Sequence, residues 1–165
     1  MTLKDGLYHI HYSPAPDLIG GMYATGGQVE TSVRAAALRP GVGLQTWLIQ
    51  HADEGYTISN PGLDPHPPLE PGPVLPGWGR MTEAENEPVL YTVRNLKNWI
   101  IAPIEDGAPE GKEIYSIRAP TRLKIRLIFY VNIDNETLAL KAYPVTEEMP
   151  PAPRWQLLYN GLPPM

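Results

Sequence analysis

The sequence contains no cysteine, and this absence removes several classes of protein at once. A disulfide framework, a thiolate metal site and a cysteine nucleophile are all excluded. At 165 residues the chain is long enough to bury a sizeable core without any such staple. We therefore expect the fold to survive in a reducing compartment.

The chain also lacks an excess of positive charge. Its 13 lysines and arginines are outnumbered by 18 aspartates and glutamates, which gives a net charge of -5. Nucleic-acid binders usually present a basic stripe. The densest basic segment, residues 118–126, alternates basic with apolar residues and predicts the solvent face of a strand. No nucleic-acid partner is expected.

Long apolar runs are missing as well. No run approaches the roughly 18 residues that a membrane-spanning helix needs. Residues 1–6 lack the apolar stretch of a secretory signal. We therefore expect a cytoplasmic protein with no membrane partner.

Present in quantity are 20 prolines, 15 glycines, 9 tyrosines and 4 tryptophans. A disordered chain would hold fewer aromatic residues, so many short strands joined by Pro/Gly-rich turns are predicted. The best helix candidate, residues 33–38, is stopped by Pro40 and Gly41 after too few residues. The predicted fold class is all-β, either a sandwich or a barrel.

Alternating segments place the expected strands. The longest are residues 123–133 and 137–143, which predict a β-hairpin turning at Asp134-Asn135-Glu136, where Asp134 and Asn135 tolerate positive φ. The other expected strands are residues 7–12, 46–50, 55–59, 89–93, 99–102 and 114–118.

An internal repeat is the most informative pattern. Three times, Tyr-x-Ile is followed about 40 residues later by Trp-x-Ile or Trp-x-Leu. Residues i and i+2 of a strand face the same side, so these large side chains can fill one shared interior. The pairs are Tyr8-His9-Ile10 with Trp47-Leu48-Ile49, Tyr56-Thr57-Ile58 with Trp99-Ile100-Ile101, and Tyr115-Ser116-Ile117 with Trp155-Gln156-Leu157.

Three units therefore divide the chain, at about residues 6–52, 55–104 and 113–160; we call them units one, two and three. Each unit has room for four strands, so twelve strands in three pseudo-repeats are predicted. That arrangement is a β-trefoil, formed as a single domain over residues 1–165. A β-sandwich is the alternative, but it does not require threefold repetition, and a propeller would need a fourth repeat.

No constellation of residues points to catalysis. His9 and His11 share a strand face at a spacing that suits a metal, but no third ligand is evident. The glycine pairs match neither a phosphate loop nor a dinucleotide fingerprint, and no serine lies in a Gly-x-Ser-x-Gly turn. We predict no enzyme activity, no cofactor and no metal.

Two binding functions then compete, because a β-trefoil scaffold does not itself name a function. Many trefoil lectins carry Gln-x-Trp in every unit. Here only Gln45-Thr46-Trp47 has it, whereas Lys97-Asn98-Trp99 and Pro153-Arg154-Trp155 do not. A carbohydrate-binding lectin is one candidate, and a protease inhibitor that places loops in an active-site cleft is the other.

Several segments resemble, in order and over nearly the whole chain, one known family. They are Asp5-Gly6-Leu7-Tyr8, Ile19-Gly20-Gly21-Met22-Tyr23-Ala24-Thr25, Gln45-Thr46-Trp47-Leu48-Ile49, Tyr56-Thr57-Ile58, Gly62-Leu63-Asp64, Ile117-Arg118-Ala119-Pro120 and Pro153-Arg154-Trp155. These segments are similar to the mycocypins, which are the clitocypins and macrocypins, mushroom protease inhibitors with a β-trefoil fold. Gly-Gly-x-Tyr-Ala is the most specific piece.

The resemblance implies tight, reversible inhibition of papain-like cysteine proteases and a role in fungal defence. In the family two loops wedge into the cleft, and here these are about residues 13–21 and 38–44. Glycines in such loops allow a close backbone approach, although they are also typical of simple turns. The candidate contact residues are Asp17, Leu18, Ile19, Gly20 and Gly21, with Arg39, Pro40, Gly41, Val42 and Gly43.

The resemblance also implies a second protease site. Many members inhibit legumain through an Asn in the loop between strands five and six, which here is the proline-rich segment 60–77. The candidate residues are Asn60, Leu63 and Asp64, but Asp64 stands where the family has Asn, and Pro61 follows Asn60. Inhibition of legumain, or of another protease class, by this loop is one hypothesis. A solvated polyproline II connector is the other.

Overall fold

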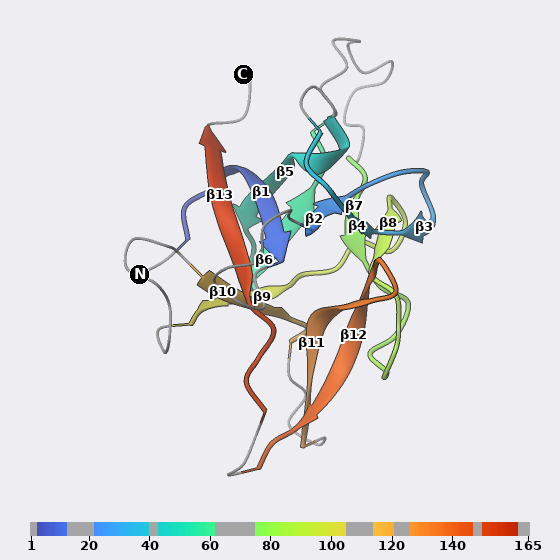
Figure 1. Ribbon diagram of the computed structural model, residues 1–165, viewed down its shortest axis with the longest axis vertical. Coiled ribbons are helices and arrows are strands. Elements are labelled where there is room, and N and C mark those ends of the chain that lie inside the picture. Colours follow the sequence, from blue (N-terminus) through green and yellow to red (C-terminus); the bar gives the residue numbers. More distant parts are fainter. Residues whose placement is uncertain are drawn as a thin grey trace.

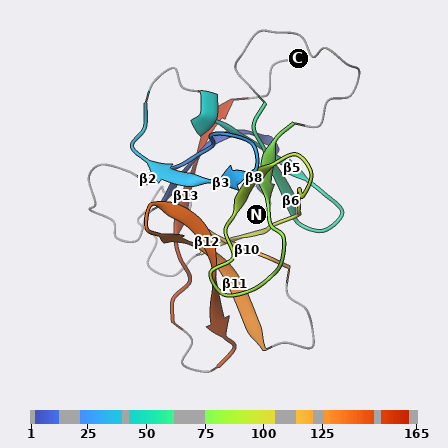
Figure 2. The same ribbon diagram turned by 90° about the vertical axis from the view of Figure 1, so that its right-hand side faces the viewer.

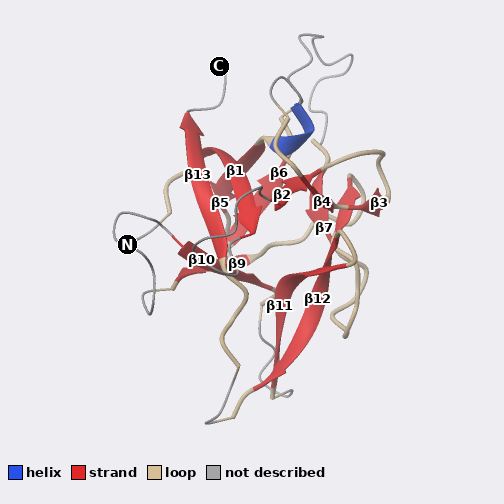
Figure 3. Cartoon of the chain, viewed as in Figure 1, coloured by secondary structure: helices blue, strands red, loops and turns tan. Residues whose placement is uncertain are grey.

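The computed structural model describes residues 3–12, 22–39, 43–61, 75–104, 114–120, 126–146 and 150–161. Strands form nearly all of the regular structure in these residues, and their single helical element is a 3-10 turn, η1, at Gly43–Gln45 (Figure 3). The all-β prediction is confirmed. Within the described ranges no helix has the length and apolar character needed to cross a membrane.

The described residues hold thirteen strands, one more than the twelve predicted. In chain order these are β1 (Gly6–Tyr12), β2 (Met22–Thr25), β3 (Thr31–Ser32), β4 (Arg34–Ala36), β5 (Trp47–His51), β6 (Tyr56–Ser59), β7 (Gly77–Gly79), β8 (Leu90–Thr92), β9 (Ile100–Pro103), β10 (Ile114–Arg118), β11 (Leu127–Asp134), β12 (Thr137–Pro144) and β13 (Trp155–Gly161). The additional strand arises in unit one, where Val33 separates β3 from β4. The backbone of Val33 is hydrogen-bonded to Val89 and Leu138 of the other two units.

Six strand positions close into a barrel. β1 pairs with β5 and β13, β5 pairs with β6, and β10 pairs with β9 and β13, all antiparallel. The last seam joins β6 to the chain just before β9, where Tyr56 and Trp99 exchange two backbone hydrogen bonds of 2.8 Å. Figure 1 shows β13, β1 and β5 side by side. A closed barrel leaves these strands no open edge at which another chain could add.

The Tyr and Trp strands of the repeat build this barrel in the same way three times. In each unit the Tyr lies opposite the Trp: Tyr8 with Trp47, Tyr56 with Trp99 and Tyr115 with Trp155. All three Trp side chains are fully buried, so each indole N–H needs an acceptor. The acceptors are the carbonyl oxygens of Ala24 (2.9 Å), Trp78 (3.2 Å) and Val131 (3.0 Å), which lie on β2, β7 and β11.

The units also meet at a cyclic set of backbone hydrogen bonds. The Val33 N–H donates to the Val89 carbonyl (2.8 Å), Val89 donates to Leu138 (2.9 Å), and Leu138 donates back to Val33 (2.9 Å). The three side chains are fully buried. One residue from each unit thus ties the β3, β8 and β12 regions together. Figure 2 shows these three strands from the right-hand side of Figure 1.

The predicted hairpin at 134–136 is present, with β11 and β12 paired from Leu127–Pro144 to Asp134–Thr137. Its two left-handed residues are Asn135 (φ 50°) and Glu136 (φ 69°). Asp134 was expected in that role, but it ends β11 and stays paired with Thr137, whose hydroxyl donates to the Asp134 carbonyl at 2.7 Å. The part of the expected first strand at residues 123–125 lies outside the described residues.

Replacing Gly79 with alanine is expected to destabilise the fold by about 1–3 kcal/mol, the usual cost of overpacking. An added Cβ would lie 2.0 Å from the Asn95 carbonyl oxygen and 2.6 Å from Thr92 Cγ2. Urea unfolding measures the loss. The matched control is Gly27→Ala, whose Cβ would have Thr31 Oγ1 as its nearest neighbour, at 4.0 Å. Equal stability of the two variants would contradict the packing described around β7.

Candidate functional site

The first candidate loop connects β1 to β2. Its candidate residues Asp17, Leu18, Ile19, Gly20 and Gly21 lie outside the described residues. The two ends of the loop are described, because β1 and β2 pair antiparallel with Tyr12 opposite Met22. The strands therefore hold the two ends of residues 13–21 next to each other.

The second candidate loop connects β4 to β5. Arg39 is exposed, and Gly43 begins the η1 turn, which the Thr46 N–H closes on the Gly43 carbonyl at 3.4 Å. Pro40, Gly41 and Val42 lie outside the described residues. The Arg39 N–H donates to Gln45 Oε1 at 2.8 Å, so the start of this loop is tied to its end.

The strands bring the ends of the two candidate loops next to each other. β2 begins where the first loop ends, β4 ends where the second loop begins, and these positions are paired, with Tyr23 opposite Ala36 and Ala24 opposite Ala35. η1 also contacts β2. Segments that are separated in the sequence thus leave the sheet side by side, as a composite binding surface requires.

The Gln-x-Trp triplet of unit one does not present its side chains to a ligand. Gln45 is only 2% exposed, and its amide bonds within the chain to Thr25 Oγ1 (3.2 Å) and to the Ala37 carbonyl (2.8 Å). Trp47 is fully buried and its indole N–H is bonded to Ala24. Because both side chains are buried and hydrogen-bonded within the protein, the Gln-x-Trp triplet does not support carbohydrate binding.

The proline-rich loop follows β6, and Leu63 and Asp64 within it lie outside the described residues. Asn60 is described and only 2% exposed. Its N–H donates to the Pro76 carbonyl at 2.7 Å, and its side chain is hydrogen-bonded to Tyr91. The ends of the loop are therefore held together next to the Ser59–Gly77 pair, and Asn60 is not presented to a partner.

The histidines noted in the sequence have partners within the protein. His9 Nδ1 lies 2.9 Å from the Gln45 carbonyl oxygen, and the His9 and His11 rings both contact Tyr23, at 6.2 and 4.6 Å between centroids. Across the described ranges, no group of three or more His, Asp and Glu side chains could hold a metal ion.

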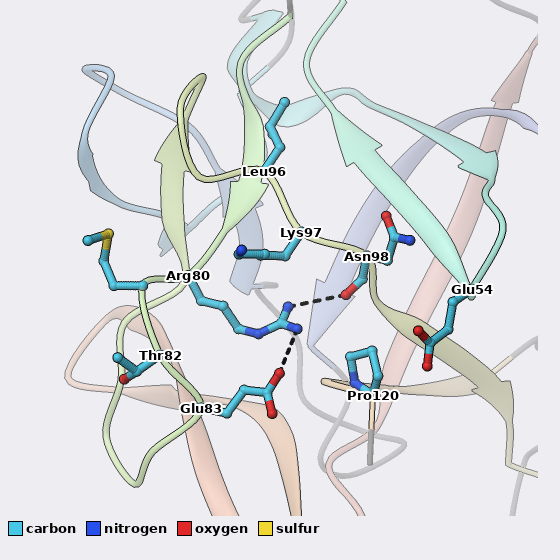
Figure 4. Close-up of a pocket in the computed structure, with 9 residues that line it drawn as sticks. Glu54, Arg80, Thr82, Glu83, Leu96, Lys97, Asn98 and Pro120 are labelled. Atoms are coloured by element: carbon cyan, nitrogen blue, oxygen red, sulfur yellow. Dashed lines mark hydrogen bonds and ion pairs between the residues drawn. The ribbon is translucent and has the colours of Figure 1, made fainter. Parts of the chain in front are cut away.

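Sequence reasoning missed a buried arginine. Arg80 is 5% exposed and lies in a surface pocket of about 500 Å³ after β7 (Figure 4). Its guanidinium donates to Glu83 (3.0 Å) and to the Asn98 carbonyl (3.1 Å), and it stacks 4.7 Å from the Trp99 ring. No motif surrounds Arg80 in the sequence, and its contacts hold the chain after β7 against the barrel.

A titratable pair outside the loops joins β5 to the start of β1. Asp5 accepts a hydrogen bond from the His51 N–H at 2.9 Å and contacts the His51 ring nitrogen Nδ1, while the His51 ring lies 4.7 Å from Tyr56. The side-chain hydrogen bond from His51, followed by the backbone one, lowers the pKa of Asp5 below the usual value of an aspartate. Elsewhere, burial raises the pKa of Tyr12 and Tyr143.

Acidification is expected to remove what Asp5 contributes to stability. A carboxyl whose pKa is lower in the folded state stabilises the protein above its unfolded pKa, and this effect is lost as the pH falls through the folded pKa. The wild type should be more stable than Asp5→Asn by a constant amount at about pH 5–6. This difference in the free energy of unfolding should disappear as the pH falls below about 4. Because the Asp5–His51 pair is exposed, the difference in the free energy of unfolding should stay below about 1 kcal/mol. Urea unfolding across pH tests this, with Asp53→Asn as control; a gap that does not change with pH would contradict it.

Comparison with protein families gives a match over most of the chain. The model of the family described as peptidase inhibitor clitocypin matches residues 6–157, a range that includes all three Tyr and Trp pairs and both candidate loops. No curated protein matches the chain.

Proposed function

Because the chain belongs to the family of the peptidase inhibitor clitocypin, it is a protease inhibitor, and we propose that the proteases it inhibits are papain-like cysteine proteases. Family membership also confirms the prediction that the chain is not an enzyme. The observation that carries the proposal is the pairing of β2 with β4, which brings the ends of the two candidate loops next to each other.

In the proposed mechanism both loops enter the active-site cleft. Glycine-rich backbone can approach the walls of a narrow cleft closely, because glycine has no side chain that would clash with them. Asp17 to Gly21 and Arg39 to Gly43 would occlude the catalytic Cys–His pair without presenting a scissile bond in the orientation needed for cleavage. Inhibition would then be reversible, and a rigid scaffold would lower the entropic cost of binding.

We infer that the barrel and its hairpins form a β-trefoil. Two repeated features support this assignment: the three Tyr–Trp strand pairs of the barrel, and the cyclic hydrogen bonds among Val33, Val89 and Leu138. A β-sandwich has no reason to repeat either feature three times. The trefoil places the two candidate loops in unit one and the proline-rich loop in unit two.

A second protease site on the proline-rich loop is also proposed, through Leu63 and Asp64. Its support is that β6 and β7 hold the ends of the loop together, so that a long insertion can project as one unit. Asn60 is left out of this proposal because it is buried. Legumain is the target that the family resemblance suggests, and Asp64 would have to enter a pocket that is selective for Asn.

Titration of papain with the protein is expected to give reversible inhibition below micromolar concentration. Gly43→Leu should raise the inhibition constant about tenfold or more, equivalent to about 1.4 kcal/mol, because a side chain there opposes close approach. The control is Gly27→Leu, on the loop after β2, where an added Cβ would have Thr31 Oγ1 as its nearest neighbour, at 4.0 Å. No inhibition by the wild type, or full inhibition by Gly43→Leu, would contradict the proposal.

Asp64→Asn is expected to strengthen inhibition of legumain. A carboxylate must take up a proton to enter a pocket suited to an amide, so the advantage of Asn should be large near pH 6 and shrink as the pH approaches about 4. Enzyme assays at several pH values measure this, and papain inhibition should not change. If neither form inhibits legumain, the second site is not directed at that enzyme.

A further inference from the structure

Gln45 is a buried polar side chain located between the two ends of the loop that connects β4 to β5. Its amide makes three hydrogen bonds. Oε1 accepts from the Arg39 N–H at 2.8 Å, and Nε2 donates to the Ala37 carbonyl at 2.8 Å and to Thr25 Oγ1 at 3.2 Å. One side chain thus connects the start of the loop, the end of the loop and β2.

The backbone around Gln45 is held as well. The N–H of Gly26, which directly follows β2, donates to the Leu44 carbonyl at 2.8 Å, and His9 Nδ1 of β1 lies 2.9 Å from the Gln45 carbonyl oxygen. η1 therefore lies against β1 and β2, the two strands that border the first candidate loop. A substitution of Gln45 would therefore disturb the backbone that supports the ends of both candidate loops.

The barrel itself does not require a glutamine at this place. The residues two positions before the barrel tryptophans of units two and three are Lys97 and Pro153, and these units still pair Tyr with Trp. In unit two the corresponding chain is held by Arg80, which donates to the Asn98 carbonyl. The amide network is therefore specific to unit one, which carries the candidate loops.

We propose that Gln45 is a positioning residue for protease inhibition, whose buried amide fixes the two ends of the β4–β5 loop in the arrangement that meets the protease. This inference rests on the proposed inhibition of papain-like proteases. An amide is suited to the task because it donates and accepts at once, matching the Ala37 carbonyl and the Arg39 N–H. A loop ordered in advance does not have to be ordered on binding, and a rigid loop is also a poor substrate.

The test compares Gln45→Met with two controls. Methionine keeps nearly the same volume but cannot form the three hydrogen bonds. Gln50→Met makes the same exchange at an exposed position of β5, and Ile58→Val lowers stability from the core without touching the loop. Papain inhibition, melting temperature and the sites of slow cleavage by papain are measured for all four proteins. If Gln45→Met does not fold, Thr25→Val takes its place, because it removes one acceptor of the network.

The expected result is an inhibition constant raised at least tenfold in Gln45→Met, with new cleavage confined to residues 37–45 and no such change in either control. Full inhibition by Gln45→Met would overturn the role of Gln45 while leaving the proposed function intact. If Ile58→Val has the same melting temperature as Gln45→Met and loses as much inhibition, the role of Gln45 is also overturned. Gln45 would then act only through the global stability of the fold. A wild type that does not inhibit papain would instead overturn the proposed function, and the role of Gln45 with it.

Discussion

Burial of three indole N–H groups is the constraint on which the rest of the structure depends. Trp47, Trp99 and Trp155 are fully buried, and a buried donor without an acceptor costs about 1–3 kcal/mol. Each donates to a carbonyl on the second strand of its own unit, so barrel and hairpins are fixed to each other at three equivalent places. Trp78 supplies one of those carbonyls and packs edge-on against Trp47 and Trp99 at 5.8 and 6.0 Å.

The loops proposed to inhibit proteases lie where this threefold scheme is broken. The units share their Tyr and Trp strands, but they differ in how the chain before each barrel tryptophan is held. Unit one uses the Gln45 amide, and unit two uses the Arg80 guanidinium stacked on Trp99. A rigid and symmetric barrel can thus carry loops of different design, because the hydrogen bonds that close it do not depend on them.

The barrel could be predicted from the sequence because large side chains that recur at similar spacing can share one interior, and a Tyr followed about 40 residues later by a Trp occurs in each unit. β2, β3 and β4 could not, since they have only four, two and three residues and are held by bonds to distant segments. The loop assignments came from resemblance to a family. The single Gln-x-Trp triplet could not show that Gln45 is buried and bonded within the chain, because its three acceptor and donor partners come from other segments.

Hydrogen exchange of the protein alone and in complex with papain tests the central claim most directly. The account predicts that papain slows exchange at residues 13–21 and 37–45. The amides of β10, β11 and β12, and those of residues 62–74 within the proline-rich segment, should exchange as in the free protein. Protection centred on residues 62–74, or spread evenly over the barrel, would contradict the claim that the paired loops of unit one form the inhibitory surface.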